Sequence, residues 1–91
     1  MMNKYFIIIG ELTFQRWGGE YLVISNKSID KLQEDPKFLK AVDEALNEMY
    51  YDFGEEDEDY EDFISDGGLI EIRPYKEEDG DLEILYDERN E

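Results

Sequence analysis

The chain has 91 residues and a formal net charge of −17, from 26 acidic and 9 basic side chains. It has no cysteine and no histidine, which excludes disulfides, thiolate metal sites, thiol nucleophiles and every catalytic arrangement that depends on histidine. This length fits one domain with one core. Such a negative charge disfavours direct binding to nucleic acid or to an anionic membrane. The apolar run Tyr5–Ile9 is shorter than a secretory or transmembrane segment, so we expect a cytoplasmic protein without membrane contact.

The first elements along the chain are two predicted strands. Residues 4–14 are rich in Ile, Phe, Tyr and Thr, which favours a strand, and a bulge is expected at Gly10. The pair Gly18–Gly19 indicates a turn. Tyr21–Ser25 would then form a second strand, antiparallel to the first.

Helices are predicted next. Asp35 and Pro36 are a helix start, because an aspartate side chain accepts the free amides and proline fits the first turn. Residues 28–34 are expected to form a short helical turn before it, and Gly54 is expected to end the helix. Apolar residues between these limits recur at spacings of three and four, as on one helix face. This stripe consists of Phe38, Leu39, Val42, Ala45, Leu46, Met49, Tyr50 and Phe53.

Two more strands are predicted late in the chain. Leu69–Tyr75 alternates between apolar and charged residues, and Asp79–Gly80 indicates a hairpin turn into a last strand. Residues 87–91 are expected to be frayed. The predicted fold class is therefore α+β: an antiparallel sheet of about four strands in the order β-β-α-(α)-β-β, with one or two helices packed on one face. The whole chain, 1–91, is expected to form a single domain.

The acidity is concentrated in the second half. Residues 1–51 carry 6 basic and 8 acidic side chains, a net charge of −2, whereas residues 52–91 carry 3 basic and 18 acidic ones, a net charge of −15. Residues 52–66, called the acidic segment below, contain no cation. The carboxylates of this segment are Asp52, Glu55, Glu56, Asp57, Glu58, Asp59, Glu61, Asp62 and Asp66.

The acidic segment differs from a solvated tail, which is what a run of like charges usually forms. It is internal, and Tyr60, Phe63 and Ile64 within it have the spacing of one helix face. We therefore predict an ordered helix at about residues 56–65, or an ordered loop, that docks these three side chains and turns the carboxylates outward. Like charges at helical spacing cost roughly 0.2–0.5 kcal/mol per pair, so the cluster suggests a functional use.

A fixed array of carboxylates can imitate the phosphates of a nucleic acid. Carboxylates on successive helix turns lie about 5–6 Å apart, comparable to neighbouring phosphates on one strand. Arginine pairs with carboxylate in the same bidentate manner as with phosphate, so an acidic domain can fill a basic groove and exclude DNA. The predicted partner-binding residues are the carboxylates of the acidic segment together with Tyr60 and Trp17. Tyr60 and Tyr75 are candidates for base-like stacking, and Trp17 is either an interface anchor or a packing group.

A strand at Glu20–Ser25, an amphipathic helix, the acidic and aromatic run Glu55–Phe63 and a short strand follow one another over residues 20–72. In this character the chain resembles small acidic phage proteins that inhibit bacterial defence nucleases, nearest the anti-CRISPR proteins that block Cas9. The resemblance implies a DNA mimic in the host bacterial cytoplasm. It also implies that the carboxylates from Glu55 to Asp66 occupy the Arg/Lys cleft that reads DNA.

Other functions stay open from the sequence. An immunity protein or antitoxin that caps the basic active site of a toxin nuclease has the same electrostatics. No glycine stands sixth in a loop that begins with aspartate and ends with glutamate, as a calcium loop requires. A small domain with solvated acids also lacks the enclosed pocket that acid–base catalysis needs. We therefore expect no metal, no cofactor and no enzymatic activity. The expected partner is a basic nucleic-acid-binding protein, either a Cas effector or another defence nuclease, and a homodimer stays open.

Overall fold

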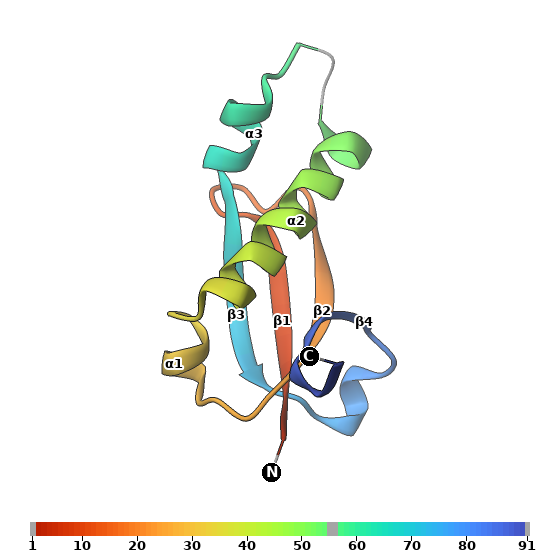
Figure 1. The fold of residues 1–91 in the computed structure, drawn as a ribbon. Helices are drawn as coiled ribbons and strands as arrows, with labels where there is room; N and C mark the ends of the chain where they lie inside the picture. The colour runs from red at the N-terminus through yellow and green to blue at the C-terminus, as the bar shows by residue number, and fades with distance from the viewer. Residues whose placement is uncertain (1, 55–56, 91) are drawn as a thin grey trace.

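The computed structural model describes residues 2–54 and 57–90 (Figure 1). Within them, four strands form one sheet and three α-helices lie between the second and third strands. This arrangement is the predicted α+β class. The strands are β1 (Asn3–Glu11), β2 (Gly18–Ser25), β3 (Gly67–Pro74) and β4 (Glu83–Asp87). The helices are α1 (Ile29–Leu32), α2 (Pro36–Phe53) and α3 (Tyr60–Ser65), and two 3₁₀ turns lie at Glu77–Asp79 and Glu88–Asn90.

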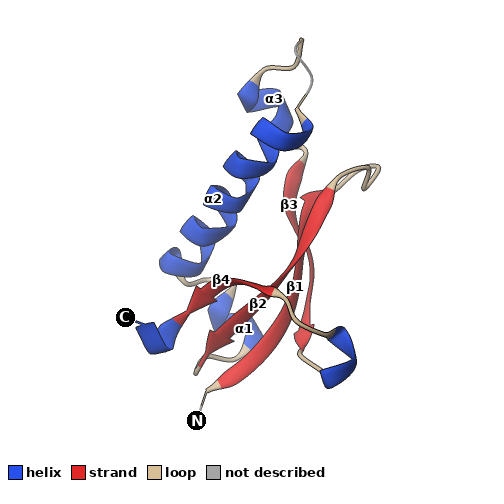
Figure 2. Ribbon diagram, turned by 90° about the vertical axis from the view of Figure 1, so that its right-hand side faces the viewer, coloured by secondary structure: helices blue, strands red, loops and turns tan. Residues whose placement is uncertain are grey.

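The sheet has the strand order β3-β1-β2-β4, which corrects the predicted late hairpin. β1 is antiparallel to both β2 and β3, but β4 lies at the opposite edge from β3 and pairs in parallel with β2. The connection at residues 75–82 passes over the face of the sheet away from α2 (Figure 2). Gly80 does turn the chain, with a φ of 76°. Tyr86 on β4, however, packs against Phe38 of α2 with ring centroids 6.5 Å apart. Tyr86 makes this contact with β4 placed next to β2.

The connection between β1 and β2 is also displaced from its predicted place. Gly18 and Gly19 belong to β2, and the chain reverses in the preceding loop, residues 12–17, which the Glu11 amide closes by donating to the Trp17 carbonyl at 3.0 Å. A Cβ on Gly10 would lie 2.5 Å from that carbonyl oxygen, so glycine is required by close approach of the strands. The bulge predicted at Gly10 lies instead between β1 and β3, where the pairing skips Ile70.

The helix α2 forms as predicted and crosses one face of the sheet (Figures 1 and 2). Asp35 accepts the Lys37 amide at 3.0 Å, and the Gly54 amide donates to Tyr50 at 2.9 Å. The centre of the predicted stripe is buried, at Phe38, Val42, Ala45, Leu46 and Met49. The prediction is wrong for Leu39 and Phe53, which are 45% and 50% exposed, because they lie at the flank and at the end of the stripe. None of the helices in the described part of the chain has both the length and the hydropathy to cross a membrane.

The residues predicted to fray are 87–91; residue 91 lies outside the described part of the chain, and residues 87–90 follow a core residue and make contacts. Tyr86 is 7% exposed and belongs to the core. Glu88 accepts the Asn26 amide at 2.7 Å and forms an ion pair with Lys27, whose ammonium also lies 3.1 Å from Asp35. These hydrogen bonds, first to Glu88 and then to Asp35, raise the pKa of Lys27 above its ordinary value. One lysine therefore joins the end of β2, the start of α2 and the last turn.

Candidate functional site

The acidic segment is anchored to the rest of the molecule by Phe63. This side chain is 1% exposed; its ring stacks on Trp17 with centroids 4.2 Å apart and meets Tyr50 edge-on at 5.4 Å. Ile64 packs against the same core, which confirms the predicted docking of these two residues. Tyr60 stays 39% exposed and meets Tyr50 edge-on at 5.2 Å.

The helix of the acidic segment is shorter than predicted. α3 begins at Tyr60, and the described residues before it, Asp57–Asp59, are not helical. Hydrogen bonds fix the backbone at both ends: the Tyr50 hydroxyl donates to the Glu58 carbonyl at 2.9 Å, and the Leu12 amide donates to the Asp66 carbonyl at 2.7 Å. The segment is therefore tied to α2 on one side and to the β1–β2 loop on the other.

These elements together form one end of the molecule, called the acidic end below. It consists of the last turn of α2, residues 57–66 and loop 12–17 (Figure 1). Seven of the nine predicted carboxylates lie in the described residues, whereas Glu55 and Glu56 fall outside them. Glu58 is half-buried and the other six are exposed. Within the described residues, none of the seven forms an ion pair with a lysine or arginine.

Three of these carboxylates share one side of α3. Asp59 precedes the helix, Asp62 lies in its first turn and Asp66 follows its last residue. By helix geometry, spacings of three and four place the three Cβ atoms in a row with steps of about 5–6 Å. The row borders the face that carries Phe63, and all three aspartates are exposed. We call this row the α3 carboxylate stripe. The phosphate-like spacing stays a prediction for this row, which spans a shorter helix than expected.

The β1–β2 loop has a cation that is held by an acid outside the acidic segment. Arg16 donates to Glu11 at both ends of its guanidinium, with Nε 3.0 Å from Oε1 and an NH2 nitrogen 2.8 Å from Oε2. Glu11 is 2% exposed, and the hydrogen bonds from Arg16 lower its pKa to about 2. This pair stiffens the loop that supports Trp17.

Three exposed aromatic side chains belong to the acidic end, one in loop 12–17 and two in the last turn of α2. Phe14 is 71% exposed, Tyr51 78% and Phe53 50%. The sequence pattern predicts Phe14 in the first strand and Phe53 in the apolar helix stripe, but β1 ends at Glu11 and Phe53 is exposed. The signal for Tyr51 is its place off the apolar stripe of α2, because a large aromatic residue on a solvent face often binds a partner.

Trp17 and Tyr75, the other aromatic residues that the sequence suggests for partner contact, have different surroundings from Tyr60. Trp17 is half-buried against Phe63, so the packing alternative describes it and only part of its ring is accessible. Tyr75 follows β3 at the far end of the strand, and its hydroxyl donates to the Gly80 carbonyl at 2.6 Å. Tyr75 is therefore not part of the acidic end.

The negative surface continues along the molecule beyond the acidic segment. Burial raises the pKa of the Tyr21 phenol, and the negative charges of Glu83, Glu48 and Asp52 raise it further. These three carboxylates come from β4 and α2, so they gather around Tyr21 on the β2 side of the fold. Acidic groups therefore extend from the acidic end towards β4.

Among residues 2–54 and 57–90, no three acidic side chains are placed to hold a metal ion. Compared with protein-family models, curated proteins and solved structures, the chain matches none. A function must therefore be argued from the acidic end itself.

Proposed function

We propose that this protein is an acidic DNA mimic, which binds the basic nucleic-acid groove of a defence nuclease and excludes DNA from it. The observation that supports this most is the α3 carboxylate stripe, three exposed acids within and at both ends of a short helix that Phe63 fixes to the core. Such a target would be met in the bacterial cytoplasm.

Fixed carboxylates suit this role better than mobile ones. A partner that binds a preformed array does not bear the entropic cost of ordering it, which for interface side chains is about 0.5–1.5 kcal/mol each. Arginines of a DNA groove can donate bidentate hydrogen bonds to the carboxylates of the stripe, as they do to phosphates. The exposed rings of Tyr51, Phe53 and Tyr60 offer flat faces for arginine or for the surfaces that stack bases. Tyr51 lines a surface hollow together with Tyr60, and Phe53 lines another with Glu58.

The test compares two variants with the same change in net charge. One neutralises the α3 carboxylate stripe (Asp59→Asn, Asp62→Asn and Asp66→Asn). The matched control neutralises three exposed acids of the 75–82 connection, at the opposite end of the molecule (Glu77→Gln, Glu78→Gln and Asp81→Asn). Each protein is immobilised, host lysate is applied, and retained DNA-binding proteins are eluted with graded salt or with duplex DNA.

The stripe variant should bind the retained nuclease at least about tenfold more weakly, a loss of about 1.4 kcal/mol. The control should differ from the unmodified protein by less than about threefold. Salt and duplex DNA should both release the partner, because the contact is electrostatic. Equal weakening of both variants would show that total charge, and not the stripe, carries the binding. Retention of a single toxin nuclease would instead favour an immunity role.

A further inference from the structure

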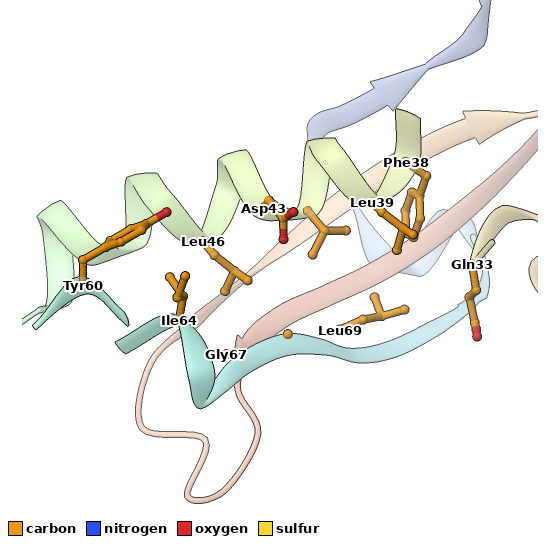
Figure 3. A pocket seen from close by; sticks show the side chains of 11 residues that line it. Gln33, Phe38, Leu39, Asp43, Leu46, Tyr60, Ile64, Gly67 and Leu69 are labelled. Atoms are coloured by element: carbon orange, nitrogen blue, oxygen red, sulfur yellow. The ribbon is translucent and has the colours of Figure 1, made fainter. Parts of the chain in front are cut away.

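A second surface lies between α2 and β3 and includes Tyr60 and Ile64 of α3, but none of the three aspartates of the α3 carboxylate stripe lines it. It is a groove with a volume of about 630 Å³ (Figure 3). Its walls are apolar, and Asp43 is the one charged residue among those described as lining it. The apolar walls are formed mainly by Leu39, Val42, Leu46, Ile64 and Leu69. Leu39 is 45% exposed, so the groove is open to solvent.

The floor of this groove runs beside a free sheet edge. β3 is the outer strand of the described sheet and pairs with β1 alone. Gly67 and Gly68 line the groove and place no side chain between the edge and a visiting chain. Beyond Leu69 the edge is interrupted, first where the pairing skips Ile70 and then at Pro74. Strand addition is therefore suited to residues 67–69, directly beside the groove.

We propose that this groove binds an extended segment of a partner protein in which an aliphatic side chain stands next to a lysine or arginine. The segment pairs its backbone with residues 67–69 and inserts the aliphatic side chain between Leu39 and Leu69. Its cation lies beside Asp43. An extended peptide laid between a helix and an edge strand gains affinity from main-chain hydrogen bonds and specificity from the pockets for alternate side chains.

Charge decides between this occupant and a second copy of the chain. Two copies would each bring a net charge of −17, and Asp43 would face further acids. A dimer through β3 would also need a longer uninterrupted edge than residues 67–69. A basic and aliphatic segment meets the opposite charge and the apolar walls together. This inference uses residues other than the α3 carboxylate stripe and holds whether or not the protein mimics DNA.

The test uses a short synthetic peptide that alternates lysine and valine, titrated into the protein and followed by backbone-amide and methyl NMR shifts. There are two control peptides. One alternates lysine with serine, and the other alternates glutamate with valine. The lysine–valine peptide should shift the methyl groups of Leu39, Val42 and Leu69 and the amides of residues 67–69 in a saturable manner. The lysine–serine peptide should shift only the acidic end, and the glutamate–valine peptide should shift neither.

Variants locate the contact. Leu39→Ser and Asp43→Asn should each weaken binding of the lysine–valine peptide by at least about fivefold. Ile84→Ser is the matched control, since Ile84 is 50% exposed on β4 at the other edge, and it should leave the affinity unchanged. In the variant with a neutralised α3 carboxylate stripe, the lysine–valine peptide should still shift the NMR signals of the groove residues. The experiment therefore distinguishes a failure of the DNA-mimic proposal from a failure of this inference. Absence of groove shifts with the lysine–valine peptide, or equal groove shifts with the lysine–serine peptide, would overturn the inference.

Discussion

Replacement of Phe63 by alanine should detach α3 and dissolve the fixed array of carboxylates. Phe63 is 1% exposed, and truncation of a buried phenylalanine costs about 3–5 kcal/mol. The variant also loses ring contacts to Trp17 and Tyr50, each worth about 0.5–1.5 kcal/mol beyond the buried area. These contacts place the cost near the upper limit, about 4–5 kcal/mol. A chain of this length has a total stability of about 5–14 kcal/mol, so α3 should open locally while the sheet and α2 persist.

Hydrogen exchange measures this opening directly. Amides of α3 should exchange about a thousandfold faster in Phe63→Ala, the equivalent of about 4 kcal/mol, while amides in the middle of α2 stay protected. Phe53→Ala is the control, since Phe53 is 50% exposed in the same region and its loss should cost below about 1 kcal/mol. Unchanged protection of α3 would refute the anchoring role of Phe63. Full binding of a basic partner by a protein with unprotected α3 would refute the need for a fixed array.

Three further outcomes test other features. The pKa of Glu11 is lowered from 4.5 to about 2, so its pair with Arg16 stabilises the fold above about pH 4.5 and loses that contribution as the pH falls towards 2. In urea unfolding, the difference between the unmodified protein and Glu11→Gln should be constant from pH 7 to pH 5 and shrink below; a difference that grows on acidification would contradict this. Sodium chloride at neutral pH should raise the urea midpoint, because it screens the self-repulsion of a net charge of −17, and a fall would show that attractive pairs dominate. Gly10→Ala should lower stability by about 1–3 kcal/mol, because the new Cβ lies 2.5 Å from the Trp17 carbonyl; an unchanged melting temperature would exclude that clash.

The helices could be predicted because their signals are local. Asp35 and Pro36 mark the start of α2, and the spacing of the apolar residues gives its buried face. The place of β4 could not be predicted in this way. The turn signal at Asp79–Gly80 is real, but which strand receives β4 depends on the burial of Tyr86 against α2, a contact between distant parts of the chain. The turn predicted at Gly18–Gly19 was wrong for a related reason. Glycine also permits close approach of strands, and both residues belong to β2.

The candidate site was predicted in its charge and only partly in its geometry. Composition alone locates the acidic segment, and the spacing of Phe63 and Ile64 predicts its docking. The α3 carboxylate stripe can be identified only when the start of the helix, at Tyr60, is known. The exposure of Phe14 depends on a loop that Glu11 and Arg16 shape, and no pattern of adjacent residues encodes that pair.

The parallel pairing of β4 with β2 has a consequence for how the protein matures. Tyr86 belongs to the core and Glu88 contacts Lys27, so the sheet lacks its last edge until these residues have left the ribosome. Pairing across the whole helical part of the chain is slow compared with forming local contacts. The finished fold should therefore arise only after residues 83–88 have been synthesised, and a nascent chain that stops before residue 83 should stay open to proteolysis.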